Sequence, residues 1–259
     1  MKTKPLVWII AGTSEGRKLI KYFASKDVEL LVSVATKYGA QLIEPQDNLT
    51  VKPARMNCAA METFIGLNKP CMVIDATHPF ATIVTDTIKK ACTITGVKYL
   101  RLLRSAGDTS GCIEVNDYEE AAEFLSHVDG NIFLTTGSKT LEIFTQVPNY
   151  QERITLRILP MISSLEKATS LGYAPSKIIC MQGPFSTELN AIMFKESQSN
   201  YVVTKDSGDV GGFPEKKTAA INSGAQLVVI KRQPGDNGGD FTHLLTEIDE
   251  ILSKEAVRC

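Results

Sequence analysis

The sequence predicts an α/β protein made of two Rossmann-like domains with mainly parallel sheets and a cleft between them. Apolar runs typical of buried parallel strands alternate with helical patterns along nearly the whole chain of 259 residues. A cluster of small, turn-forming residues at 105–111 interrupts this alternation and indicates a domain boundary. Polar residues and glycines gather directly after the apolar runs, where open α/β sheets place their ligands.

The first domain is expected over residues 1–104. Its strands are predicted at 6–11, 30–35, 49–51, 72–74 and 97–103. The first strand leads at once into a helix whose apolar side chains recur at helical spacing, namely Leu19, Ile20 and Phe23. A later helix has an apolar face made of Val84, Ile88, Ala91 and Cys92.

The second domain is expected over residues 105–259, where the same alternation starts again. It opens with a helix whose apolar face is formed by Ala121, Phe124, Leu125 and Val128. Strands are predicted at 132–134, 154–159, 177–181, 201–204 and 226–230. An amphipathic helix closes the chain, with Leu244, Leu245, Ile248, Ile251 and Leu252 on one face.

Composition excludes several classes of function. The formal net charge is −1, and no basic stripe suggests a nucleic-acid partner. No apolar run is long enough to span a bilayer or to form the core of a signal peptide, so a cytoplasmic protein is expected. The six cysteines form no C-x-x-C pair, and the three histidines are far apart in sequence. No metal site is therefore expected.

The first strand ends at the segment Gly12–Arg17, which is typical of the start of a nucleotide pocket. Gly12 permits a tight turn and a close approach of phosphate to the backbone, and the following helix presents unpaired N–H groups. The dinucleotide fingerprint G-x-G-x-x-G is incomplete, because Ser14 and Arg17 occupy its second and third glycine positions. An ordinary glycine turn at the edge of a sheet is the alternative.

Two further strand ends in the first half carry candidate binding residues. After the second strand, no acidic residue is present for the ribose of NAD, and Thr36 with Lys37 suits the 2′-phosphate of NADP or forms a solvated turn. The segment 75–81 combines an acid, a hydroxyl, an imidazole and an aromatic ring in one turn before a helix. It suits a nicotinamide, although Asp75 or Thr77 could simply cap the helix.

The strand ends of the second half favour an anionic ligand. Thr135–Lys139 combines hydroxyls, a glycine and a lysine, without the spacing of an ATP-binding loop. Two glycine-containing loops follow later strands, at 182–186 and 204–208. Each could be a long surface loop, but together they indicate a flexible substrate-binding edge.

Five of these segments, at 12–17, 75–81, 135–139, 183–186 and 204–208, stand in an order that resembles the precorrin-6A reductase family of cobalamin biosynthesis, including its cobalt-precorrin-6A branch. The resemblance runs from about Val7 to Ile230. It implies an oxidoreductase that transfers a hydride from NADPH, or alternatively NADH, to one double bond of a tetrapyrrole, giving precorrin-6B or its cobalt form. Any cobalt would belong to the substrate. A monomer or weak homo-oligomer is expected, with no nucleic-acid or membrane partner.

The resemblance and the strand-end positions together suggest roles for individual residues. Expected at the cofactor are Gly12, Thr13, Ser14, Gly16 and Arg17 (pyrophosphate), Thr36 and Lys37 (adenosine ribose), and Asp75, Ala76, Thr77, His78 and Pro79 (nicotinamide). Expected at the substrate are Arg104, Thr136, Gly137, Ser138, Lys139, Gly183, Pro184, Phe185, Ser186, Lys205, Ser207 and Gly208. His78 is the expected catalytic proton donor, with water as an equal alternative.

Two other functions compete with this hypothesis. A generic NAD(P)H-dependent reductase of a small carbonyl compound would usually carry a Tyr-x-x-x-Lys pair, which the sequence lacks. A non-enzymatic nucleotide-sensing module would use the first domain alone, and it would leave the anion-favouring loops of the second half without a purpose.

Overall fold

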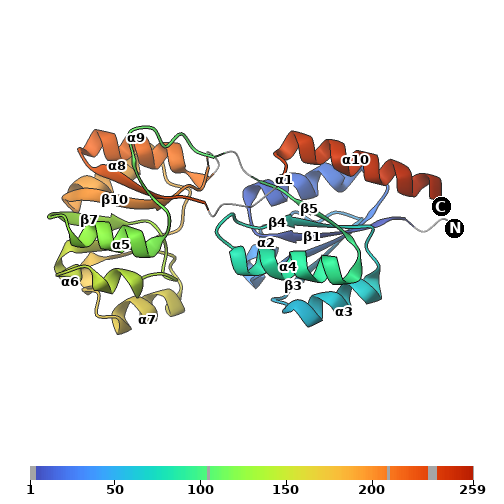
Figure 1. Ribbon diagram of the computed structural model, residues 1–259, viewed down its shortest axis with the longest axis horizontal. Helices are drawn as coiled ribbons and strands as arrows, with labels where there is room; N and C mark the ends of the chain where they lie inside the picture. Colours follow the sequence, from blue (N-terminus) through green and yellow to red (C-terminus); the bar gives the residue numbers. More distant parts are fainter. Residues whose placement is uncertain (1–3, 104–105, 209–210, 233–237, 259) are drawn as a thin grey trace. The chain divides into compact units, whose positions relative to one another are not determined.

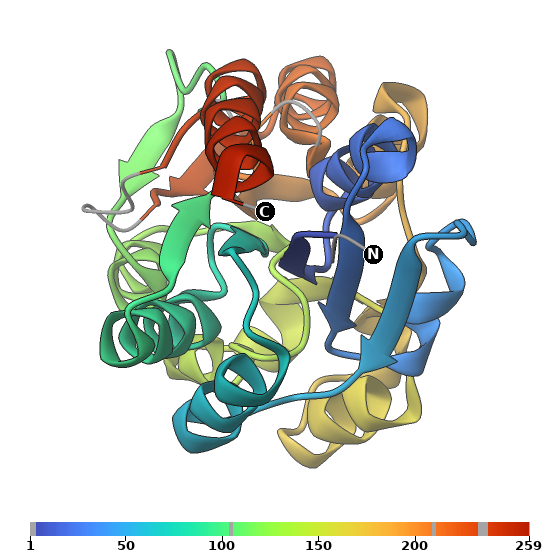
Figure 2. The same cartoon turned by 90° about the vertical axis from the view of Figure 1, so that its right-hand side faces the viewer.

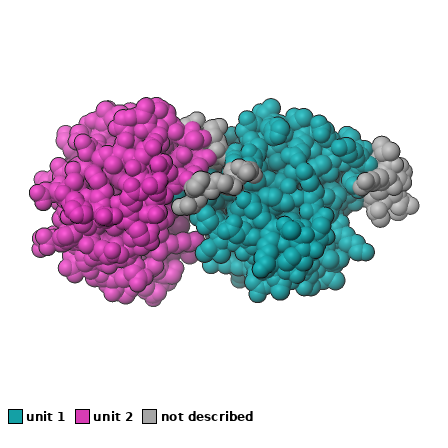
Figure 3. All heavy atoms as spheres, viewed as in Figure 1, with its two compact units in different colours: residues 1–104, 235–259 teal, residues 105–234 magenta. Residues whose placement is uncertain are grey.

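The computed structural model describes residues 4–103, 106–208, 211–232 and 238–258. The chain forms two compact α/β units (Figure 1). Unit 1 comprises residues 1–104 together with 235–259, and unit 2 comprises residues 105–234, as coloured in Figure 3. Each unit has its own parallel sheet and its own core, which confirms the predicted fold class of two Rossmann-like sheets.

The described part of unit 1 contains one five-stranded parallel sheet in the order β3-β2-β1-β4-β5. Its strands are β1 (Leu6–Ala11), β2 (Glu29–Val34), β3 (Leu49–Pro53), β4 (Met72–Ala76) and β5 (Lys98–Arg101). Strands are added outward from β1 in both directions, so the order reverses between β1 and β4. In a doubly wound sheet this reversal is the topological switch point, where ligands bind beyond the carboxyl ends of the strands.

Helices cover both faces of this sheet, as Figure 2 shows with unit 1 toward the viewer. The helices of unit 1 are α1 (Ser14–Tyr22), η1 (Phe23–Ser25), α2 (Lys37–Gln41), α3 (Cys58–Asn68), α4 (Thr82–Thr95) and α10 (Phe241–Arg258). Alternate residues of β1 enter two cores, because successive strand side chains point to opposite faces. Val7 and Ile9 pack with α1 and α10, whereas Trp8 and Ile10 pack with α3 and α4.

The C-terminal helix corrects the expected extent of the second domain, 105–259. Helix α10 packs in unit 1, where Leu244 and Ile248 are buried in the core shared by β1 and α1. The chain enters this helix beside β5, since Gly239 N donates to Arg101 O and Gly239 O accepts from Leu103 N. The physical reason is that an amphipathic helix is needed to cover the face of the first sheet beside α1.

Unit 2 contains, within its described residues, a six-stranded parallel sheet in the order β6-β11-β10-β7-β8-β9. Its strands are β6 (Ile113–Val115), β7 (Asn131–Leu134), β8 (Ile154–Ile158), β9 (Ile178–Cys180), β10 (Ser199–Lys205) and β11 (Gln226–Ile230). Strands β7 to β9 are added in one direction, and β10 then pairs with the other side of β7. The switch point of this sheet therefore lies between β7 and β10.

The helices of unit 2 are α5 (Tyr118–Ser126), η2 (Ile143–Gln146), α6 (Tyr150–Arg153), α7 (Ile162–Ser170), η3 (Pro175–Lys177), α8 (Thr187–Glu196) and α9 (Phe213–Ser223). Figure 1 shows α8 and α9 on one face of the sheet and α5 and α7 on the other. The first face is sealed by an apolar cluster in which Phe133 of β7 meets Phe194 of α8 and Phe213 of α9. Both faces are covered, so the polar loops are restricted to the ends of the strands.

Candidate functional site

The switch point of unit 1 joins two loops that the sequence predicts to be functional. Thr13 follows β1 and its hydroxyl donates to Ala76 O, at the end of β4, over 2.9 Å. The same hydroxyl accepts the amide of Gly16 at 3.0 Å and so caps helix α1. Thr13 is buried, which keeps this link away from competing water. The structure thus brings the segments 12–17 and 75–79 together.

The two glycines of this loop have different environments. A Cβ placed on Gly12 would meet nothing within 4 Å, so the backbone faces open space where a phosphate could approach. A Cβ on Gly16 would lie 3.4 Å from the Cβ atoms of Ala11 and Ala76, so this glycine permits close packing of α1 on the sheet. Arg17 is exposed one residue further along α1.

A small pocket adjoins this helix. Its volume is about 230 Å³, and its lining includes Ser14, Arg17, Lys18 and Lys21 of α1, with Leu42, Ile43, Glu44 and Gln46 of the loop after α2. The three cationic side chains on its helical wall outnumber the one lining carboxylate, Glu44, so the pocket suits an anionic group. Ser14 is half-buried at the start of α1.

The carboxylate of Asp75 is completely buried at the end of β4 and organises the loop that follows. Arg101 Nη1 lies 2.9 Å from Asp75 Oδ1, which also accepts the amide of Thr77 at 3.0 Å. Asp75 Oδ2 accepts the hydroxyl of Thr85 at 2.8 Å and that of Tyr99 at 3.2 Å. Asp75 and Ala76 are therefore enclosed by the protein, and their side chains support the loop from beneath.

Arg101 is a residue that sequence reasoning did not assign. It closes β5 with a side chain that is 1% exposed, and its guanidinium donates to Thr77 O at 3.1 Å and to the Thr77 hydroxyl at 3.2 Å. A signal was available, because an arginine at the end of an apolar strand needs a buried acid and Asp75 ends the neighbouring strand. The pair fixes the path of the chain into His78.

His78 lies half-buried at the top of this loop, with Pro79 buried behind it. The amide of Phe80 donates to His78 Nδ1 at 3.2 Å, so Nδ1 acts as an acceptor. This contact favours the tautomer that carries its proton on Nε2. The imidazole is thus oriented as a donor at the carboxyl edge of the sheet.

Thr36 and Lys37 lie at the end of β2, the strand that neighbours β1. The Thr36 hydroxyl accepts the amide of Gly39 at 3.0 Å and caps the short helix α2, while both side chains are exposed. Their place is next to the Gly12 turn on the same edge of the sheet, as the sequence predicts.

The switch point of unit 2 presents a second polar edge. Thr135 follows β7 and bonds back to β10 through its amide and its hydroxyl, both of which donate to Val203 O. The next residue, Thr136, is 4% exposed, and its hydroxyl has no hydrogen-bond partner among the described residues. A buried hydroxyl without a partner is unfavourable unless a ligand completes it. Gly137 then adopts a left-handed conformation with φ +82°.

Three desolvated cations converge near this edge. Burial lowers the pKa of Lys205, at the end of β10, to about 8, and the charge of Lys139 adds to the shift. Burial also lowers the pKa of Lys216 on α9 to about 8, with a contribution from Arg157, and the pKa of Arg157 itself to about 10. Mutually repelling, partly dehydrated cations are typical of a site built for an anion.

Arg157 and Lys216 are the residues of this cluster that the sequence interpretation missed. Arg157 lies in strand β8 between the apolar residues Leu156 and Ile158 and donates to Asn190 Oδ1 at 2.8 Å, and its guanidinium lies 3.7 Å from the centre of the Phe185 ring. A Cβ on Gly183 would lie 2.8 Å from that ring, so the glycine makes room for Phe185. Phe185 thus packs against Arg157, and Gly183 leaves the space that its ring occupies.

The remaining predicted substrate residues fall into three groups. Ser138 contacts the hydroxyl of Ser164 at 3.0 Å, and Lys139 is exposed beside it. Ser207 and Gly208 are buried in a turn in which the Ser207 hydroxyl donates to Gly211 O. In the loop before α8, Ser186 caps the helix and Pro184 is exposed. Arg104 lies outside the described residues.

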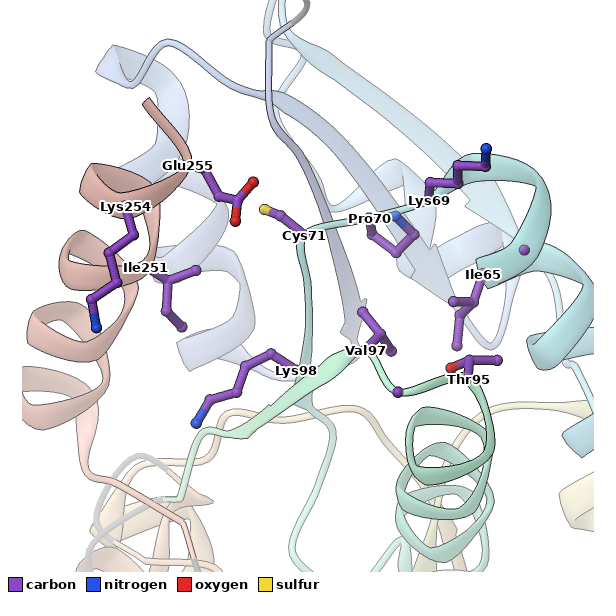
Figure 4. A pocket seen from close by; sticks show the side chains of 12 residues that line it. Ile65, Lys69, Pro70, Cys71, Thr95, Val97, Lys98, Ile251, Lys254 and Glu255 are labelled. Carbon is purple, nitrogen blue, oxygen red and sulfur yellow. The ribbon is translucent and has the colours of Figure 1, made fainter. Parts of the chain in front are cut away.

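Another pocket, of about 790 Å³, lies at the opposite edge of the first sheet, where β4 and β5 begin (Figure 4). Its lining includes Ile65, Val97 and Ile251 and none of the predicted site residues. In Figure 4 the Glu255 carboxylate points toward the Cys71 thiol, and burial together with this carboxylate raises the pKa of that thiol to about 11. This raised pKa favours the protonated thiol of Cys71 at neutral pH.

The described residues contain no group of three or more His, Cys, Asp and Glu side chains placed to hold a metal ion. No helix in the same part of the chain is long and apolar enough to cross a membrane.

Two doubly wound sheets, each with polar loops at its switch point, define an α/β protein of two Rossmann-like units. The sequence matches the family described as precorrin-6x reductase CbiJ/CobK over residues 6–254. The chain belongs to this family, which confirms the resemblance inferred from the five sequence segments.

Individual relatives and a solved structure agree with this membership. The chain is 34% identical over 258 residues to the cobalt-precorrin-6A reductase of Methanothermobacter thermautotrophicus, covering 97% of this chain and 85% of the relative. It is 29% identical to the cobalt-precorrin-6A reductase of Salmonella typhimurium, covering 96% of this chain and 92% of the relative. The solved structure of CobK precorrin-6A reductase has the same fold, with a TM-score of 0.75 at 21% identity over 95% of this chain and 97% of that one.

The lowered pKa of Lys205 predicts a pH-dependent effect of its replacement on stability. An unfolded lysine has a pKa of about 10.5, so between pH 8 and 10.5 the unfolded state binds more protons, and folding becomes more favourable as the pH rises. Lys205→Met should therefore be more stable than the wild type at pH 7, and this advantage should disappear by about pH 10.5. Urea unfolding across this range measures it.

Lys205→Arg is the matched control. It keeps its charge throughout, so its stability relative to the wild type should fall as the pH rises above 8. A pH-independent difference for both variants would contradict the desolvation of Lys205.

Proposed function

We propose that this chain reduces precorrin-6A, or its cobalt complex, with NADPH as the hydride donor. The observation that carries the proposal is the cluster of desolvated cations Arg157, Lys205 and Lys216 in unit 2, which suits a ligand bearing several carboxylates. The other unit supplies a switch point with an open glycine turn. Family membership supports this reaction, because the relatives include precorrin-6A and cobalt-precorrin-6A reductases.

The residues of unit 1 fit a dinucleotide. The open space over Gly12, the amides at the start of α1 and the charge of Arg17 suit a pyrophosphate, and Ser14 adds a hydroxyl beside them. Thr36 and Lys37 would then meet the adenosine ribose, with Lys37 near its 2′-phosphate. Gly16 contributes by close packing rather than by contact.

The loop Thr77–Pro79 would lie against the nicotinamide. When bound, this ring supplies a hydride to one carbon of a ring double bond of the substrate. In our proposal Asp75, Ala76 and Arg101 hold the loop in place from below, since the ion pair of Asp75 and Arg101 is buried. Preorganisation of this kind keeps the reacting groups aligned without rearrangement during the reaction.

The substrate carboxylates would bind at the edge formed by β7, β8 and β10. Thr136 offers its unpartnered hydroxyl, Gly137 and Ser138 offer backbone amides, and Lys139 offers an exposed charge. Lys205, Lys216 and Arg157 complete the cationic lining. Binding of carboxylates here would restore the charge balance that burial disturbs, so part of the folding penalty of the empty site is recovered on binding.

The proposed activity is tested by mixing the purified protein with NADPH and cobalt-precorrin-6A. We expect loss of NADPH absorbance together with a change in the tetrapyrrole spectrum, and a parallel sample with metal-free precorrin-6A decides which substrate is preferred. No NADPH oxidation with either tetrapyrrole, and no thermal stabilisation by them, would overturn the assignment.

Replacement of Lys37 by alanine tests the proposed cofactor preference. Loss of a cation beside the 2′-phosphate should raise the KM for NADPH about tenfold, in line with a charged hydrogen bond of about 1.5–3 kcal/mol, and should leave the KM for NADH nearly unchanged. Steady-state kinetics with both cofactors measure the ratio. Lys90→Ala, at an exposed position of α4, serves as a charge-matched comparison, and equal effects on NADPH and NADH would contradict the role of Lys37.

His78→Gln tests the source of the proton that must reach the carbon beside the reduced one. General acid catalysis by a positioned side chain contributes about 10²–10⁴-fold, so kcat should fall by at least a hundredfold if His78 donates from Nε2. The Kd for NADPH should change little. An unaltered kcat would show instead that water delivers the proton.

A further inference from the structure

An exposed apolar surface lies at the carboxyl edge of the sheet in unit 2. Five large apolar side chains form it, and we call them the apolar platform: Leu159, Met161, Ile162, Leu165 and Met181. Their exposed fractions are 49%, 53%, 78%, 43% and 39%. Single exposed apolar residues need no explanation, but a contiguous group on one edge of a sheet is typical of a binding surface.

Backbone contacts show that the platform is contiguous. Leu159 directly follows β8, and Met181 directly follows the neighbouring strand β9, with Met181 N donating to Ile158 O at 3.0 Å. The chain passes from Leu159 through a turn into α7, in which Met161 O accepts the amide of Leu165 at 3.1 Å. The residues of the platform therefore extend from two adjacent strand ends.

The platform is also continuous with the cationic site. Ser164 of α7 contacts Ser138 at 3.0 Å, and Lys167 of the same helix donates to Lys139 O at 2.9 Å, so α7 is fixed against the loop after β7. Along the sheet the strand order is β10, β7, β8, β9. One half of the edge, at β10 and β7, carries Lys205 and Lys139, and the other half carries the apolar side chains.

This division of one edge identifies the chemistry of its ligand. A sugar phosphate would match the cations and leave the apolar half without a partner, whereas an aliphatic ligand would do the reverse. A flat conjugated ring with carboxylates on its rim matches both halves. The thioethers of Met161 and Met181 suit such a ring in particular, because sulfur is polarisable and makes favourable contacts with π systems.

We infer that the apolar platform receives one face of the substrate macrocycle while its rim carboxylates bind the cations of β10, β7 and β8. This inference rests on the proposed function and adds to it the residues that select a macrocycle over other polyanions. Leu159, Met161, Ile162, Leu165 and Met181 act as specificity determinants through contact with the ring.

The test compares the binding of uroporphyrin, a stable carboxylated macrocycle, to wild-type protein and to the double variant Ile162→Gln/Met181→Gln, by absorbance and fluorescence titration. Loss of apolar contact at two side chains should weaken binding about tenfold or more. The dependence of Kd on salt should stay as in the wild type. Lys205→Met should instead weaken binding and reduce that dependence, because salt screens the charge interactions alone.

Ile221→Gln is the matched control. Ile221 is 68% exposed in the same unit, near the carboxyl end of α9, and its replacement should leave uroporphyrin binding unchanged. Thermal unfolding of each variant tests for loss of structure. Because Ile162, Met181 and Ile221 are exposed, the melting temperatures of the double variant and of the control should remain close to that of the wild type.

Several results would overturn the inference while leaving the proposed function intact. One is unchanged uroporphyrin affinity, together with an unchanged KM for cobalt-precorrin-6A, in the double variant. Another is a wild-type dimer that the double variant converts to monomer without loss of affinity, which would make the platform a self-association surface. Failure of the proposed function is distinct, since it would appear as absence of NADPH oxidation in the wild type itself.

Discussion

The functional edge of unit 1 depends on the buried ion pair between Asp75 and Arg101. A carboxylate withdrawn from water is tolerated only when its charge and its lone pairs are satisfied. Here the guanidinium of Arg101 balances the charge of Asp75, and Thr77, Thr85 and Tyr99 donate hydrogen bonds to its two oxygens. Such a pair adds little net stability, although removing one partner costs about 3–5 kcal/mol. Its effect is geometric. Because both members bond to Thr77, the chain leaves β4 along one path, and that path carries the His78 loop to the switch point.

Unit 2 uses a related arrangement and combines it with a different electrostatic environment. Asp206, directly after β10, pairs with Arg232 at 3.1 Å and accepts the amides of Gly107 and Gly208. The neighbouring cations of β8, β10 and α9 are in a less favourable environment than this ion pair. Burial lowers their pKa values, and they repel one another. Folding would be easier if these residues were apolar. We interpret these cations as residues that lower the free energy of unfolding and serve ligand binding instead.

The sequence predicts the parallel strands and their polar ends well, because periodicity and turn residues are local properties. The Gly12–Arg17 turn, the 75–81 loop and the 135–139 loop all lie where they are expected. Helix α10 was assigned to the wrong unit, since its pattern shows an apolar face without showing which sheet that face covers. Arg157 was missed for a similar reason. Its neighbours in β8 are apolar, and only the three-dimensional structure brings Lys216 and Phe185 to it. Strand β6 was also missed, because Glu114 interrupts its three residues, whereas the equally short β9 lies in a continuous apolar run.

The structure also explains why the first turn departs from the dinucleotide fingerprint. In that fingerprint one glycine makes the turn, a second permits the phosphate to approach, and a third allows the helix to pack closely on the strand. Gly12 leaves the space above the turn open, and Gly16 provides the close packing on Ala11 and Ala76. The role left over is that of fixing the turn itself, which here is held against the neighbouring strand β4. Thr13 performs it, because its hydroxyl bonds both Ala76 O and the amide of Gly16. A side-chain hydrogen bond therefore secures the geometry that the usual motif obtains from an additional glycine, and it ties the Gly12 turn directly to the loop that carries His78.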